Sequence, residues 1–254
     1  MAEQRYTGDL RGAEFVNADL RGARFRSSEL GGVVMRGIGI AGAEIDDPWL
    51  FEGEGALMVN GVDVAPYVEA ELNRRFPGRE RRRAEDPEGL REAWEELQQA
   101  WAAAVQRAAA MPEGGVDFSI GGEWSFAQTL RHLVMATDTW LRKAILGVER
   151  PYHPIGQPDA SFKDAEGVFA AGTPPFADVL EVRAERVAMV RDFLAAATPE
   201  QLDETRPNPH APQYPETVRS CLHTILEEEW EHLRFALRDL DVIERTPPER
   251  ASGP

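Results

Sequence analysis

The first part of the chain repeats an apolar residue every five positions. Across residues 7–46, each five-residue step has a large apolar residue at its centre and, in most steps, a small residue two positions earlier. Neither the 3.6-residue period of an α-helix nor the two-residue period of a β-strand fits this spacing. The pattern therefore predicts a repeat unit. Its eight centres are Leu10, Phe15, Leu20, Phe25, Leu30, Met35, Ile40 and Ile45.

The period becomes helical from residue 86. Apolar residues recur there every three or four positions, which is typical of amphipathic helices that bury one face. Asp86, Ser125 and Thr173 are placed to act as N-caps of three of these helices. Four long amphipathic helices predict a bundle. They are expected over residues 86–111, 125–146, 174–198 and 216–243.

A bridging segment separates the repeats from the helical part. Asn60-Gly61 lies between β-branched residues and predicts a hairpin, and Pro66 suits the first turn of a helix over residues 67–76. The arginine-rich residues 79–83 predict a solvated linker. The chain then divides into a repeat unit at 7–46, a bridging hairpin, helix and linker at 47–84, a four-helix bundle at 85–244 and a disordered tail at 245–254.

The five-residue steps resemble the pentapeptide-repeat family, as in Ala-Asp-Leu-Arg-Gly at residues 18–22. The resemblance implies a right-handed β-helix with four pentapeptides per turn, and so about two coils here. A stack this short leaves both ends of its apolar column exposed, because repeat stacks need several units or caps. The unit is expected to be a structural cap on the next domain. DNA mimicry or protein docking is the alternative.

Composition excludes several classes of function. Asp and Glu number 44 against 28 Lys and Arg, and the net charge of −16 repels nucleic acid and anionic lipid. No apolar run reaches the length of a membrane span, and the start of the chain does not resemble a secretory signal. The single cysteine, Cys221, allows neither an intrachain disulfide nor a multi-cysteine metal site. We therefore expect a cytoplasmic protein that binds neither nucleic acid nor membrane.

Polar residues interrupt the apolar face of the last helix. Glu228 and His232 are four residues apart on its flank, where they can present an oxygen and a nitrogen to one ion. Glu229 falls at the centre of the apolar arc, so it needs an arginine, a histidine or a metal as partner. His132, in the second helix, is the natural third ligand. Cys221 is two turns from Glu228 and is expected to be a core residue.

The sequence Leu-Arg-His-Leu at residues 130–133, paired with Glu228-Glu229-Trp230-Glu231-His232, resembles the DinB-like superfamily of four-helix metalloproteins. The resemblance covers about residues 86–243 and implies a mainly α fold. It also implies a divalent metal, most often Zn or Ni, held by His132, Glu228 and His232. Many members have a second histidine after the last ligand, where this chain has Leu233. Glu229 therefore stays an alternative to Glu228.

Two classes of function follow. Three N and O ligands leave coordination positions open, and an ion bound there lowers the pKa of a bound water or thiol. The superfamily includes mycothiol-dependent maleylpyruvate isomerases, so the resemblance implies a thiol-dependent transferase or isomerase acting on a small electrophile. Tyr152 and His153, in the long loop 148–172, are candidates for the substrate rim. The expected partners are this small molecule and, in a homodimer, a second copy. The alternative is a non-catalytic binding or assembly module with a retained or structural metal site.

Overall fold

The computed structural model describes residues 5–51, 55–112, 114–158, 162 and 167–245. It divides into two compact units, Met1–Asp46 and Asp47–Pro254, which are described separately. Nearly all of the predicted disordered tail, residues 246–254, lies outside the described residues. No helix in the described part of the chain combines the length and the hydropathy that a membrane crossing requires.

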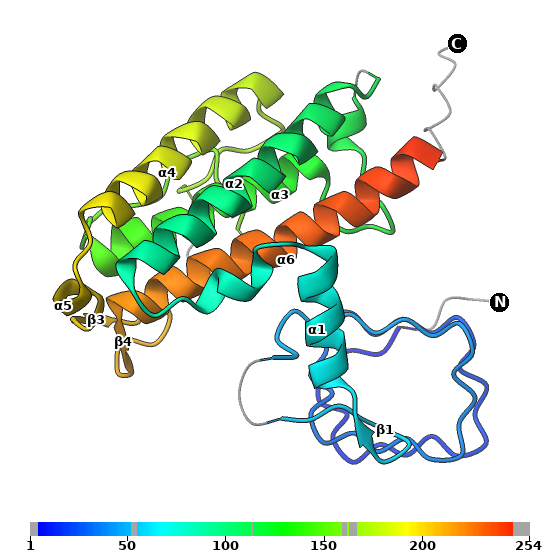
Figure 1. The fold of residues 1–254 in the computed structure, drawn as a ribbon. Coiled ribbons are helices and arrows are strands. Elements are labelled where there is room, and N and C mark those ends of the chain that lie inside the picture. Colours follow the sequence, from blue (N-terminus) through cyan, green and yellow to red (C-terminus); the bar gives the residue numbers. More distant parts are fainter. Residues whose placement is uncertain (1–4, 52–54, 113, 159–161, 163–166, 246–254) are drawn as a thin grey trace, which may run out of the picture. The chain divides into compact units, whose positions relative to one another are not determined.

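The N-terminal unit turns a corner at every pentapeptide. A positive φ recurs at every fifth residue from Gly12 to Gly42, including Asn17 and Ser27. At alternate corners a carbonyl accepts from the amide three residues on, as Leu10 does from Ala13. Glycine then occupies the third turn position, where a type II turn requires a positive φ. Figure 1 draws the unit as a winding trace.

The repeat unit contains no β-strand among its described residues. Its eight apolar centres are exposed, each by at least 45%. The regular corners fit a coil whose period is set by five-residue steps. The right-handed β-helix itself stays a prediction.

The second unit begins with the predicted hairpin. Strands β1 (Met58–Val59) and β2 (Val62–Asp63) pair antiparallel. Asn60 and Gly61 between them both have a positive φ, which is the requirement of a type I′ turn. Helix α1 (Ala65–Arg75) follows, with a proline in its first turn. The hairpin and the helix that the sequence predicts are therefore both present.

Four long helical stretches form the bundle, and Figure 1 shows α2, α3, α4 and α6 lying alongside one another. Their apolar faces build one core, in which the side chains of Leu90, Leu97, Leu133 and Leu233 are fully buried. The mainly α fold class is thereby confirmed. The bounds are α2 (Pro87–Ala109), α3 (Phe126–Thr137) continued by the π-helix η3 (Asp138–Ile145), α4 (Phe176–Ala196) and α6 (Val218–Arg245).

Two of the three predicted N-caps are present. Asp86 accepts from two backbone amides at the start of α2, and Ser125 forms a reciprocal capping box with Gln128 at the start of α3. Thr173 does not cap α4, because that helix begins later and has Pro175, without a side-chain cap, at its N-cap position. The capping prediction at Thr173 is therefore wrong.

The connections between the helices contain short elements that the periodicity did not predict. Between α4 and α6 the chain forms a four-residue helix and an antiparallel ribbon of two three-residue strands, so residues 86–243 are not purely helical. A short 3₁₀ turn precedes α3. The bounds are η2 (Gly115–Asp117), α5 (Pro199–Leu202), β3 (Thr205–Pro207) and β4 (Pro215–Thr217).

The arginine-rich run is not a solvated linker. It forms the 3₁₀-helix η1 (Arg79–Arg83), in which Arg79 is 1% exposed and Arg82 is 4% exposed. Arg79 pairs with Glu231 of α6 at 3.3 Å, and Arg82 pairs with Glu227 of the same helix at 3.3 Å. Buried charges require partners of this kind, so η1 is a packed part of the second unit.

Candidate metal centre

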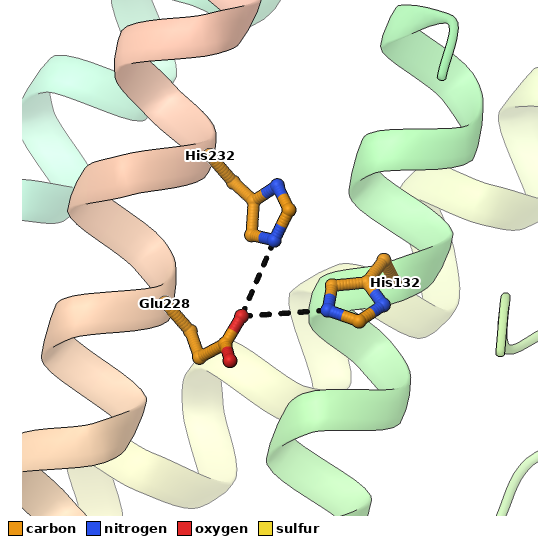
Figure 2. A group of neighbouring side chains, drawn as sticks. All are labelled: His132, Glu228 and His232. Carbon is orange, nitrogen blue, oxygen red and sulfur yellow. Dashed lines mark hydrogen bonds and ion pairs between the residues drawn. The ribbon is translucent and has the colours of Figure 1, made fainter. Parts of the chain in front are cut away.

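Three side chains from two helices converge inside the bundle (Figure 2). His132 projects from the middle of α3, while Glu228 and His232 lie one turn apart on α6. The Nε2 atom of His132 is 3.4 Å from Glu228 Oε2, and that of His232 is 3.2 Å from the same oxygen. Each residue offers one ligand atom, and these atoms all lie within 4.8 Å of one another. The structure thus brings together the three ligands that the resemblance implies.

The packing of the two helices explains this convergence. On α3, Leu130 and Leu133 face the core and leave His132 at the edge of the apolar arc. On α6, Glu228 and His232 lie on one face because their spacing is close to one helical turn. The side chains of Glu228 and His232 are 18% and 15% exposed, whereas that of His132 is 7% exposed. His132 is therefore more deeply buried than the two residues on α6.

The electrostatics of the cluster favour an ionised Glu228 and a neutral His232. Burial raises the pKa of Glu228, but hydrogen bonds and charge from His132 and His232 outweigh it, so the pKa lies well below its ordinary value. Burial lowers the pKa of His232, and the neighbouring His132 lowers it further, against the opposite effect of Glu228. One carboxylate oxygen with two imidazole nitrogens is a donor set suited to a divalent transition metal.

A backbone carbonyl fixes the tautomer of His132. Its Nδ1 is 3.1 Å from the carbonyl oxygen of Gln157, in the long loop after η3. A carbonyl oxygen only accepts, so Nδ1 carries the proton and donates it. In the neutral ring, the lone pair of His132 is then on Nε2, the atom that faces Glu228. Sequence reasoning missed this contact, because any residue supplies a carbonyl and no side-chain pattern indicates it.

Two aromatic rings lie against the histidines. The ring centroid of Trp124, in the segment just before α3, is 4.6 Å from that of His132 and 5.8 Å from that of His232. The ring centroid of Phe235 is 6.0 Å from that of His232. Sequence reasoning did not select either residue. The position of Trp124 directly before the Ser125 cap, about two helical turns before His132, is the only local signal.

Glu229, the alternative ligand, is not part of the cluster. It is 1% exposed, and both of its carboxylate oxygens contact Arg183 of α4, at 2.5 and 2.6 Å. Burial raises the pKa of Glu229, and Arg183 acts in the opposite direction. The carboxylate at the centre of the apolar arc therefore has an arginine as its partner.

The described contacts of the two rim candidates are with residues outside the cluster. Tyr152 packs against two phenylalanine rings of its own loop. His153 donates its backbone amide to Asp138 at 2.8 Å, and its Nδ1 accepts from the amide of Ile155. Among the described residues, no hydrogen bond, ion pair or ring contact joins Tyr152 or His153 to the cluster. The same loop reaches the cluster through Gln157 instead.

Cys221 is fully buried in the core on α6, as expected. Burial raises the pKa of its thiol to about 12. Because the thiolate is the reactive form, we expect Cys221 to react with a disulfide reagent only when the protein unfolds. Absorbance titration in native buffer and in denaturant measures this difference. Rapid stoichiometric labelling of the folded protein would contradict the burial of Cys221.

The fold and the cluster together define a four-helix bundle protein with a histidine–carboxylate cluster that could hold a metal ion. A family model, the DinB superfamily, matches residues 96–236, which is more than half of the chain and includes all three cluster residues. The chain belongs to the DinB superfamily. Pentapeptide repeats, in eight copies, match residues 8–37. No curated protein and no solved structure gives a match to the chain.

Proposed function

We propose that this protein is a DinB-like metal-dependent enzyme, in which His132, Glu228 and His232 hold one divalent ion, Zn or Ni. The observation that carries the proposal is the convergence of both Nε2 atoms on one oxygen of Glu228. With its proton on Nδ1, His132 directs a lone pair at an anionic oxygen. Two electron-rich atoms repel each other, so this arrangement is stable only when a proton or a cation lies between them.

The distances support a metal ion as that cation. Two ligand atoms that are each about 2.0–2.1 Å from one tetrahedral ion lie about 3.3–3.4 Å apart. The two nitrogen–oxygen distances in the cluster are 3.4 and 3.2 Å. Two of the three pairs of ligand atoms therefore already have the separation that a zinc-like ion requires, and the third pair lies within 4.8 Å.

The chain's own residues supply the rest of the site. When bound, the ion would lower the pKa of a thiol or water in an open position, creating a nucleophile at neutral pH. Glu228 contributes the negative charge, Gln157 orients His132, and the rings of Trp124 and Phe235 exclude water beside the histidines. The proposed reaction is a transfer or isomerisation that delivers a mycothiol-type thiol to a small electrophile, in the cytoplasm and without nucleic acid or membrane.

The repeat unit has a separate proposed role. Its corners at five-residue intervals support a short right-handed β-helix of about two coils. A stack of this length serves best as a structural cap.

The experiment that tests the enzyme begins with metal analysis of protein purified without an affinity tag. The Co²⁺-substituted protein is then titrated with mycothiol, glutathione and cysteine, and the thiolate-to-metal absorption band is followed. We expect saturable thiol binding that is lost in His132→Ala. Binding by none of these thiols, with the metal demonstrably present, would favour the non-catalytic module with a structural or retained site.

A further inference from the structure

Residues 153–157 of the long loop are attached to α3 and η3 by a series of hydrogen bonds. Asp138 accepts from the amide of His153 at 2.8 Å, and Arg131 Nε donates to the carbonyl of Ile155 at 2.8 Å. The amide of Gln157 then donates to the carbonyl of Arg131 at 3.2 Å. The carbonyl of Gln157, the next group along, accepts from His132 Nδ1. The contact that sets the tautomer of His132 is thus the last in this series.

Arg131 occupies a special place in the series. It adjoins His132 in sequence, it is 6% exposed, and its guanidinium donates to the backbone of Ile155, two residues before Gln157. Its own carbonyl receives the amide of Gln157. A buried guanidinium is costly to desolvate, and here it donates to a neutral loop carbonyl. Arg131 therefore holds both ends of the short segment 155–157 against α3, Ile155 through its side chain and Gln157 through its carbonyl.

We infer that Arg131 is a positioning residue, which holds residues 155–157 so that the Gln157 carbonyl keeps the proton of His132 on Nδ1 and its lone pair on Nε2. Groups that orient a metal-binding histidine in this way set both its tautomer and its basicity. The consequence for metal affinity rests on the proposed function. The consequence for the tautomer of His132 does not.

The first measurement uses the metal-free protein. Arg131→Met keeps the length and apolar stem of the side chain but removes the donor to Ile155. The ring nitrogens of His132 are observed by ¹⁵N NMR at a pH where the imidazole is neutral. We expect one tautomer, protonated on Nδ1, in the wild type and a mixture of both in Arg131→Met, with faster amide hydrogen exchange at Gln157. Arg131→Lys, which keeps a donor, should restore part of the single-tautomer signal.

A matched control separates this effect from a general loss of stability. Arg191→Met removes an arginine that pairs with its neighbour Asp192 on the surface of α4, and it should leave the spectrum of His132 unchanged. If Arg131→Met is folded and His132 keeps its single tautomer, the inference is wrong. If Arg131→Met does not fold, Arg131→Lys and Arg131→Gln decide the question by the same spectrum.

The second measurement is zinc affinity, by competition with a chromogenic chelator. We expect Arg131→Met to bind zinc about 10–100-fold more weakly than the wild type, the range for loss of an orienting partner. Equal affinity in both proteins would contradict the role of Arg131 at the metal. A wild type that binds no zinc would contradict the proposed function, while the tautomer measurement would still decide the role of Arg131.

Discussion

Replacing His232 by alanine is expected to abolish stoichiometric binding of zinc or nickel and to leave the helical content nearly unchanged. The substitution removes one of two nitrogen ligands and leaves His132 and Glu228, which are too few for a stable site. The bundle persists because its apolar core holds it together, and Leu233 and Leu240 of α6 are buried in that core. Metal analysis and circular dichroism measure the two quantities.

His210→Ala provides the control for this experiment. His210 is exposed, and its ring contacts Trp140 instead of the cluster. We expect the His210 variant to retain full metal content. Full occupancy in His232→Ala would show that the ion is held by other residues.

The features predicted correctly from the sequence are local ones. The helical stripes, the caps at Asp86 and Ser125 and the turn at Asn60-Gly61 each depend on residues within one or two turns of chain. The spacing of Glu228 and His232 is of the same kind, because a helix places residues four apart on one face. His132 required the resemblance as well, since a lone histidine at the edge of a helix carries no signature of its partners.

The features missed depend on residues distant in sequence. Arg79 and Arg82 belong to a charged run that cannot be distinguished locally from a solvated one, and their partners on α6 follow about 150 residues later. The contact of His132 with Gln157 involves a backbone carbonyl, which has no pattern in the sequence. Packing, not local preference, decides both cases.

Glu229 lies between these two classes. Its place at the centre of the apolar arc predicts burial and a partner, and both are present. The sequence does not identify that partner, because Arg183 is on a different helix. The apolar pattern of each helix does not specify how the two helices are rotated relative to each other. Loss of the Arg183–Glu229 pair has the largest effect on stability that we expect.

Replacing Arg183 by methionine is expected to destabilise the folded protein by about 3–5 kcal/mol, because it leaves the carboxylate of Glu229 buried without its partner. Denaturant unfolding followed by circular dichroism measures the free energy of unfolding. The double variant Arg183→Met/Glu229→Leu should recover most of the loss, since apolar side chains of similar volume often replace a buried ion pair at little cost. A single variant as stable as the wild type would show that Glu229 is hydrated or paired elsewhere.

The loss in Arg183→Met should also depend on pH. Burial already raises the pKa of Glu229, and removing Arg183 takes away an influence that lowers it. A carboxyl whose pKa is higher in the folded than in the unfolded state favours folding at low pH, and this contribution is lost as the pH rises through the folded pKa. The deficit relative to the wild type should therefore be larger at about pH 7 than at about pH 5, where Glu229 is more readily protonated. A deficit that grows on acidification would mean that Glu229 is not the group left unpaired.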